Sequence, residues 1–204
     1  MTTTRRQRSD GARSRETILR AAANLATTEG LEGLSIGSLA DRIGMSKSGL
    51  YAHFGSKEEL QLATVETAEA IFTAEVVEPT AAIADSIQRL LALTDTFIDH
   101  LERRVFQGGC FFAATWTEFA TRPGRVKDRI VEVQQGWMAL LTGLIVEAQA
   151  AGALREDEDA GQLAFEIESY LLMGNTSFVA TDDSTHLHRA RAAVVRRLEL
   201  ATSR

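Results

Sequence analysis

A short polar stretch in the N-terminal quarter of the chain carries the side chains whose chemistry is easiest to interpret. Lys47 and Lys57 supply positive charge. Ser48 and Tyr51 supply hydroxyl groups, and Gly49 has no side chain. Cationic and hydroxyl side chains are frequent partners of DNA phosphates, and a glycine lets a backbone approach a groove closely. This combination predicts a surface that contacts DNA.

Two short helices must position these side chains. Ile36, Leu39 and Ile43 recur at three- and four-residue spacing, which is one face of a helix. Ser35 stands before that face as a candidate N-cap. Gly44 follows it, and glycine adopts the left-handed conformation that ends a helix without steric cost.

The second helix begins after Ser46, another candidate N-cap, and places Leu50 and Phe54 on its apolar face. Gly55 ends it, and Ser56 begins a further helix with the spacing of a capping box. Two short helices joined by a glycine turn form a helix-turn-helix. The alternative is an ordinary helical hairpin with a solvated polar face.

The string from Ser35 to Leu60 resembles the DNA-binding signature of the TetR family of bacterial regulators, and the resemblance extends over roughly residues 14–60. The matching residues are Leu39, Ala40, Gly44, Met45, Ser46, Gly49, Leu50, Tyr51, His53, Phe54, Lys57, Glu58, Glu59 and Leu60. The resemblance implies that the remaining chain is all-helical, binds a ligand and dimerises.

The same resemblance assigns roles within the interface. It implies phosphate contacts for Lys47, Tyr51, His53 and Lys57, and positions at or near base edges for Ser46, Ser48 and Gly49. The predicted DNA-binding residues are Ser35, Ser46, Lys47, Ser48, Gly49, Tyr51, His53 and Lys57.

Charge is unevenly distributed along the 204 residues, whose net charge is −6. Residues 1–57 hold nine Lys or Arg and five Asp or Glu, a balance of +4, and the rest hold 13 and 23, a balance of −10. A basic end on an acidic body is typical of a DNA-reading head joined to a domain that does not bind DNA. Apolar residues make up 45% of the chain, enough for a sizeable core.

The predicted fold class is all-α, because the chain has two prolines and no alternating runs typical of strands. We expect a helix-turn-helix domain over residues 1–57 and a helical ligand-binding and dimerisation domain over residues 58–204. Residues 1–12 are polar and basic without periodicity, and we interpret them as a mobile arm. Its arginines are candidates for a minor groove, and the alternative is a disordered tail that adds only nonspecific attraction.

Helical spacing continues through the second part of the chain. It predicts helices at about 13–29, 57–77, 81–105, 110–120, 123–150, 157–179 and 185–200. No flexible linker follows the helix-turn-helix, so one continuous helix from Lys57 is expected to join both parts.

Aromatic residues concentrate between positions 97 and 137, with polar side chains among them. Ligand pockets are mostly apolar walls with a few convergent polar groups, which favours a pocket for an apolar or amphipathic small molecule. The alternative is plain core packing. The predicted ligand-binding residues are Phe97, His100, Phe111, Phe112, Trp116, Phe119, Gln134 and Trp137.

The segment at about 157–179 is apolar on more than one face, as Phe165 and Leu172 lie off the stripe that contains Leu163. A surface helix of a monomer needs only one apolar stripe, so a second face predicts a second burial partner. We expect a homodimer built from this helix and the next one, with Leu163, Phe165, Leu172 and Val195 at the interface.

Several functional classes have no support in the sequence. A single cysteine, Cys110, excludes an internal disulfide and is typical of a small core residue, although oxidant sensing is the alternative. His186 and His188 diverge on a helix, so no metal site is expected. There is no phosphate-binding glycine loop, nucleophile elbow or HExxH motif, so we expect neither a cofactor nor enzyme activity. No apolar run spans a membrane and no signal segment is visible, which predicts a cytoplasmic protein.

The sequence therefore predicts a ligand-responsive transcriptional regulator. We expect a repressor that leaves a palindromic operator when a small molecule binds. Two alternatives remain within this class, an activator and a regulator without an effector. From a different class, the alternative is a helical binding protein or enzyme that retains a helix-turn-helix.

Overall fold

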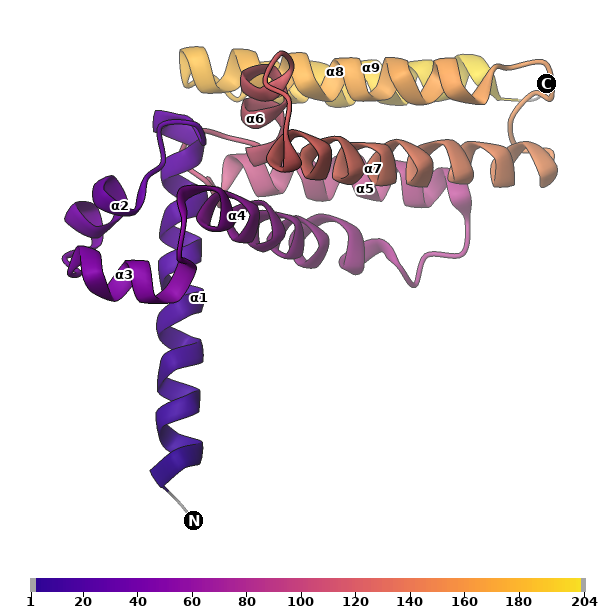
Figure 1. Ribbon diagram of the computed structural model, residues 1–204. Helices are drawn as coiled ribbons and strands as arrows, with labels where there is room; N and C mark the ends of the chain where they lie inside the picture. The colour runs from indigo at the N-terminus through magenta and orange to yellow at the C-terminus, as the bar shows by residue number, and fades with distance from the viewer. Residues whose placement is uncertain (1–2, 203–204) are drawn as a thin grey trace. The chain divides into compact units, whose positions relative to one another are not determined.

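The computed structural model describes the backbone of residues 3–202 and the side chains of residues 15–202. Within this range the chain is helical, with an isolated bridge between Leu154 and Thr202 and no strand, so the predicted all-α class is confirmed (Figure 1). The α-helices are α1 Thr3–Glu29, α2 Ile36–Ile43, α3 Lys47–Phe54, α4 Lys57–Phe72, α5 Ser86–Glu102, α6 Phe111–Phe119, α7 Arg125–Ala150, α8 Ala160–Thr181 and α9 Thr185–Ala201.

Helix α1 is longer than the sequence predicts. Residues 3–12, expected to form a non-helical arm, belong to this helix. Extending an existing helix adds one hydrogen bond for each residue that becomes ordered, whereas only nucleation is costly, and residues 3–12 contain no proline. The side chains of residues 1–14 lie outside the described residues, so the role predicted for Arg5, Arg6 and Arg8 in a minor groove stays a prediction.

Contacts between Cα atoms group the chain into two compact units. The first unit comprises Met1–Ile71 and Phe106–Ile130, and the second comprises Phe72–Val105 and Val131–Arg204. Helix α6 and the start of α7 therefore pack with the N-terminal helices, although they follow α5 in sequence. This grouping reflects packing alone, so the functional division at residue 57 stays a prediction.

The helix-turn-helix of the first unit rests on small and branched residues. Leu39 and Ala40 of α2 and Leu50 of α3 are wholly buried. Burying a leucine side chain contributes roughly 1.5–3 kcal/mol, and Ala40 leaves room for α3 to approach α2 closely. The guanidinium of Arg15 lies 5.3 Å from the centre of the Phe54 ring, which adds a contact between α1 and the end of α3.

The predicted helix from Lys57 to about residue 77 is present, but its last turns change geometry. Helix α4 ends at Phe72, a π-helix spans Thr73–Val77, and a 3₁₀-helix spans Glu78–Thr80. Pro79 lies in the 3₁₀-helix, where the predicted break occurs. In α5, the Thr96 hydroxyl donates a hydrogen bond to the carbonyl oxygen of Val76 at 2.9 Å, which fixes the π-helical turn.

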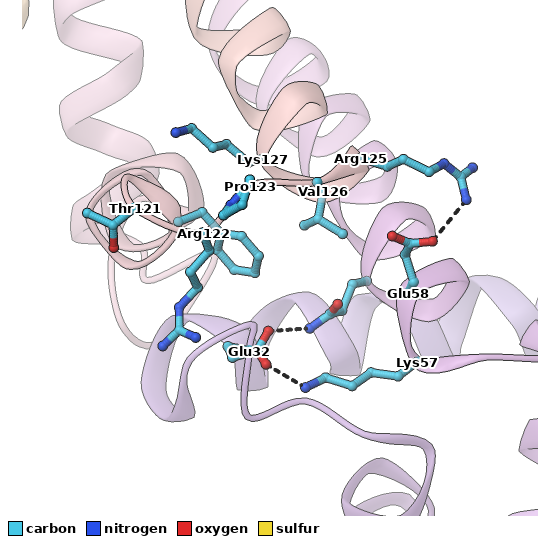
Figure 2. A pocket seen from close by; sticks show the side chains of 12 residues that line it. Glu32, Lys57, Glu58, Thr121, Arg122, Pro123, Arg125, Val126 and Lys127 are labelled. Carbon is cyan, nitrogen blue, oxygen red and sulfur yellow. Dashed lines mark hydrogen bonds and ion pairs between the residues drawn. The ribbon is translucent and has the colours of Figure 1, made fainter.

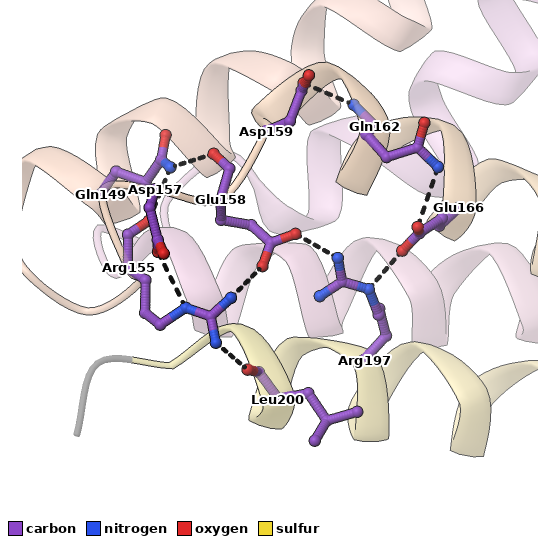
Figure 3. A network of polar contacts seen from close by, with 9 residues as sticks. All are labelled: Gln149, Arg155, Asp157, Glu158, Asp159, Gln162, Glu166, Arg197 and Leu200. Carbon is purple, nitrogen blue, oxygen red and sulfur yellow. Dashed lines mark hydrogen bonds and ion pairs between the residues drawn. The ribbon is translucent and has the colours of Figure 1, made fainter.

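In the second unit, α8 and α9 pack closely along their lengths. A Cβ atom placed on Gly174 would lie 2.7 Å from the Cβ atom of Ala190, so only glycine permits this approach. Figure 3 shows a polar network near the start of α8, in which the Arg197 guanidinium donates to both Glu158 and Glu166. Asp159 caps α8 by accepting from the backbone N–H of Gln162 at 3.0 Å. These contacts make the helix pair a well-ordered surface.

Candidate nucleic-acid interface

The predicted caps hold the helix-turn-helix in place. Ser35 caps α2 in a reciprocal box with Ser38, and Gly44 ends the helix in the left-handed conformation with φ of 69°. Ser46 caps α3 by accepting from the backbone N–H of Gly49 at 3.1 Å. Gly55 follows α3 as its C-cap. The local sequence thus determines where each of the two short helices begins and ends.

Helix α3 buries its apolar face and leaves its polar face in solvent. Leu50 and Phe54 are buried, whereas 59% of Tyr51 is exposed. Of the other predicted contact residues, Ser46 to Gly49 and His53 belong to α3 and its N-cap, whereas Ser35 caps α2 and Lys57 begins α4. Ser46, Lys47, Ser48, His53 and Lys57 are exposed, and Ser35 and Gly49 are partly exposed. Their geometry is compatible with a DNA contact, and their individual roles stay predictions.

Both lysines of this surface have carboxylate partners that sequence analysis did not identify. The Lys57 ammonium lies 2.9 Å from Oε1 of Glu32, and its hydrogen bond lowers the pKa of Glu32 below the ordinary value of 4.5. The Lys47 ammonium lies 3.6 Å from Asp41 across the turn. Asp41 is near Lys47 in sequence, but Glu32 is 25 residues from Lys57, a separation that no helical spacing reveals.

A cavity of about 540 Å³ adjoins Lys57 within the first unit, between the start of α4 and the α6–α7 turn (Figure 2). Its walls carry Lys57, Arg122, Arg125 and Lys127 beside two glutamates. Arg125 is paired with Glu58 at 3.1 Å, as Lys57 is with Glu32. Of the predicted ligand-binding residues, Phe119 lines this cavity.

The predicted ligand-binding residues divide between the two units. Phe111, Phe112 and Phe119 are buried in the first unit, where the Phe111 ring packs against Phe106 and Phe112. Trp116 is also in the first unit and is 41% exposed. Their role in ligand binding stays a prediction.

The other four predicted residues lie in the second unit, and three of them contact Phe72, which sequence analysis did not select as a ligand-binding residue. The Phe72 ring makes edge contacts with Phe97, His100 and Trp137, with centroids 5.3–6.2 Å apart. Burial lowers the pKa of His100 to about 4. Phe72 continues the apolar face of α4, so its helical spacing was the available signal. We call Phe72, Phe97, His100 and Trp137 the aromatic cluster.

A carboxylate lies beside this cluster. Glu168 of α8 accepts a hydrogen bond from Trp137 Nε1 at 2.8 Å and another from Gln134 Nε2 at 3.0 Å. Sequence spacing along α8 gave no reason to select Glu168, because its partners come from α7. The second unit therefore places aromatic rings beside a hydrogen-bonded carboxylate, and a ligand site there stays a prediction.

The predicted dimer residues on α8 fall into two groups. Phe165 is 61% exposed and Leu172 is 36% exposed, whereas Leu163 is wholly buried within the chain. The assignment of Leu163 to the interface is therefore wrong, because its side chain already packs inside the second unit. Val195 of α9 is partly exposed. Val179 was missed, although it follows Phe165 and Leu172 at the same seven-residue spacing.

The described residues also bear on metal binding and membrane insertion. No three His, Cys, Asp or Glu side chains in residues 15–202 gather as a metal site. Among the helices in the described part of the chain, none is long and apolar enough to cross a membrane. Cys110 is buried at the start of α6.

Two family profiles match the chain. The family described as bacterial regulatory proteins, tetR family, matches residues 18–64. The tetracyclin repressor-like C-terminal domain matches residues 86–194, which is more than half of the chain. Both profiles describe transcriptional regulators rather than enzymes.

Solved structures and a curated relative agree with these profiles. A TetR transcriptional regulator from Chloroflexus aurantiacus has a TM-score of 0.87 and 25% identity, with 95% of this chain and 98% of that chain covered. AibR, solved with isovaleryl coenzyme A and operator DNA, has a TM-score of 0.73 and 26% identity, with 88% and 95% covered. The transcriptional activator FasR of Mycolicibacterium smegmatis is 34% identical over 85 residues, which are 42% of this chain and 39% of FasR.

These matches extend over both the helix-turn-helix and the helical region that follows it. They agree with the capped helices α2 and α3 and with the exposed polar face of α3. The chain belongs to the TetR family of bacterial transcriptional regulators.

Proposed function

We propose that this regulator is a repressor that leaves a palindromic operator when a small apolar or amphipathic molecule binds its second unit. The exposed polar face of α3 is the observation that carries the proposal. The proposed phosphate contacts are Lys47, Tyr51, His53 and Lys57. The proposed residues at base edges are Ser46, Ser48 and Gly49. Ser35 holds the start of α2, which supports the reading helix.

A homodimer is the form that binds the operator. Phe165, Leu172 and Val179 are exposed and follow one another at seven-residue intervals, so they form a stripe along α8. Between them, the hydroxyls of Ser169 and Thr176 donate to backbone oxygens of α8 itself. Since these donors are already satisfied, the stripe can be buried against a second copy at little polar cost. With two-fold symmetry, the half-sites lie one helical turn of about 34 Å, or a multiple, apart.

The aromatic cluster is the part of the second unit best suited to an effector. Its rings provide apolar contact area, and Glu168 with Gln134 provides a polar anchor beside it. His100 is neutral at pH 7, because its pKa is about 4, so the cluster carries no buried positive charge. The AibR structure contains both isovaleryl coenzyme A and operator DNA, a precedent for a similar chain that binds a small molecule and DNA.

Helix α4 provides the connection between the effector and the operator. It begins at Lys57, a proposed phosphate contact, and ends at Phe72, whose ring lies in the aromatic cluster. A ligand that displaces Phe72 therefore acts on the helix that carries Lys57. A coupling of about 1–3 kcal/mol lowers operator affinity roughly 5- to 150-fold, and operator DNA weakens ligand binding by the same factor.

The proposal is tested by titrating candidate ligands against tryptophan fluorescence, with and without operator DNA. A DNA site selected from a random pool by the protein serves as operator. We expect a ligand that quenches the fluorescence to bind less tightly when operator is present. Equal affinity in both conditions would reject that ligand as the effector of this switch.

Activation is the second candidate, because the matched part of FasR belongs to an activator. Transcription in vitro from a promoter that carries the selected site separates the two. A repressor lowers transcript yield and the effector restores it, whereas an activator raises transcript yield. A yield that changes with protein but with no tested ligand would favour a regulator without an effector.

A further inference from the structure

Glu118 of α6 contacts the turn between α1 and α2, and the proposed function assigns no role to this contact. Its two carboxylate oxygens accept hydrogen bonds from the backbone N–H groups of Leu31 at 2.8 Å and Glu32 at 2.9 Å. These residues form the turn between α1 and α2, about 86 positions away in sequence. A charged acceptor that bonds two backbone donors is among the stronger hydrogen-bonded contacts in proteins. Helix α6 is thereby tied to the entrance of the helix-turn-helix.

The turn is shaped to receive this carboxylate. Gly30 has a φ of 85°, and a Cβ atom at this position would lie 2.7 Å from Oε1 of Glu118. A side chain at position 30 would thus strain the backbone and also displace the carboxylate from its present place. Gly44 shares the left-handed backbone of Gly30, with a φ of 69°, but no atom lies within 4 Å of a Cβ atom placed there.

The turn is also fixed from its other side and leads directly into α2. Nε2 of Gln61 donates to the carbonyl oxygen of Leu31 at 2.7 Å. Leu31 and Leu34 are buried, so the chain reaches the N-cap Ser35 with little freedom. The placement of this turn therefore sets the placement of α2, against which α3 packs.

Segments adjoining α6 strengthen the same attachment. The backbone N–H of Gln107 donates to Asn24 Oδ1 at 2.8 Å, and that of Gly108 donates to Thr27 Oγ1 at 3.0 Å. A Cβ atom on Gly108 would lie 2.1 Å from the carbonyl oxygen of Thr27. The chain from Gln107 to Glu118 thus contacts the last turns of α1 and then the turn beyond it.

We propose that Glu118 is a positioning residue for operator recognition, which orients α3 for base readout through the α1–α2 turn. The proposal rests on the proposed function, because it assumes that α3 reads DNA bases. Base readout needs a closely defined helix position, whereas attraction to phosphates depends on charge and tolerates small shifts. Loss of the contact therefore reduces specificity rather than general affinity for DNA.

The test compares the full-length homodimer with its Glu118→Gln variant. Glutamine keeps the shape of the side chain but accepts one N–H bond and presents an NH₂ group to the other donor. We expect operator affinity to fall about tenfold, the scale of one base contact that a shifted α3 no longer makes well. Affinity for unrelated DNA and the slope of operator affinity against salt stay unchanged, because no cation is removed.

Lys57→Ala is the matched contrast, since it weakens binding to operator and unrelated DNA together. Operator affinity of Glu118→Gln within twofold of wild type would overturn the proposal. Equal losses for both DNAs would also overturn it, because they indicate a general structural role. Hydrogen exchange of free protein adds a second measurement, in which the variant exchanges the Leu31 and Glu32 amides faster. Unchanged exchange there would show that the contact does not hold the turn.

A glycine comparison keeps the proposal testable if Glu118→Gln folds poorly. Gly30→Ala and Gly44→Ala both place a side chain at positive φ, but the first also collides with Glu118. Adding Glu118→Ala should lower the operator affinity of Gly44→Ala as much as it lowers that of wild type. It should lower the affinity of Gly30→Ala much less, because the new methyl group has already displaced the carboxylate. Equal behaviour of the two pairs would overturn the proposed contact. A wild-type protein that selects no DNA sequence would instead refute operator binding itself.

Discussion

Helices α3 and α8 both leave one face in solvent, but the two faces have opposite chemistry. The α3 face carries lysine, serine, tyrosine and histidine side chains. Lys47 on this face and Lys57 at the start of α4 are each paired with a carboxylate in the free protein. The α8 face carries Phe165, Leu172 and Val179, with intervening hydroxyls bonded to their own helix. Solvated charge is an ordinary state for a surface, whereas a continuous apolar stripe favours burial. We therefore expect a transient polar contact at α3 and a lasting apolar contact at α8.

A charge in the apolar stripe provides the strongest test of this contrast. We expect Leu172→Glu to raise the dissociation constant of the dimer by at least ~100-fold, because an unpaired carboxylate would be buried at the interface. Sedimentation of wild type and variant measures the change. Val146→Glu is the control, since Val146 is an exposed apolar residue of α7. A wild-type monomer at micromolar concentration would contradict the proposed interface.

Removing the polar contacts of the reading face should have the next largest effect. With Lys47, Tyr51 and Lys57 all replaced by alanine, we expect operator affinity to fall by at least about 100-fold and the salt slope to drop by about four units, one for each of the four lysines that the dimer loses. The measurement is a fluorescence anisotropy titration at several salt concentrations. Lys127→Ala serves as control, because Lys127 belongs to α7 and its ammonium donates to the carbonyl oxygen of Ala120. Unchanged affinity in the triple variant would rule out the assigned surface.

The aromatic cluster predicts a pH dependence of stability. Burial lowers the pKa of His100 from 6.5 to about 4. The unfolded chain therefore binds a proton first as pH falls, so the stabilising contribution is complete above pH 6.5 and is lost progressively toward pH 4. Between pH 7.5 and pH 5 the free energy of unfolding should fall by about 2 kcal/mol from this group. Urea unfolding of wild type and His100→Leu measures it, and parallel pH curves would contradict the prediction.

The smallest effect concerns the carboxylate beside Lys57. Glu32→Gln removes a negative charge next to the proposed phosphate contact, so operator affinity should rise about threefold at low salt. The gain should vanish at high salt, where exposed charges are screened. Glu16→Gln, a change of the same kind on α1, is the control in the same titration. A weaker complex would show instead that Glu32 guides Lys57 toward the phosphate.

Most of the fold follows from local sequence. The caps at Ser35 and Ser46, the C-terminal Gly44 and the apolar spacing of each helix are short-range features, so the chain order of the helices was predictable. The prediction of a non-helical arm was wrong at residues 3–12. These residues are polar and lack an apolar period, although they extend α1. Local spacing also placed Leu163 at an interface, because periodicity identifies apolar faces but not which neighbour covers each one.

The sequence by itself determined the helix-turn-helix, the outward residues of α3 and the all-α class, since each depends on contacts within a few residues. Only the tertiary structure decided that Glu32 pairs with Lys57, that Glu168 joins Gln134 and Trp137, and that Glu118 holds the α1–α2 turn. The partners in these contacts lie 25 to 87 residues apart. Helical spacing carries no information over such separations, because packing of distant helices brings the groups together.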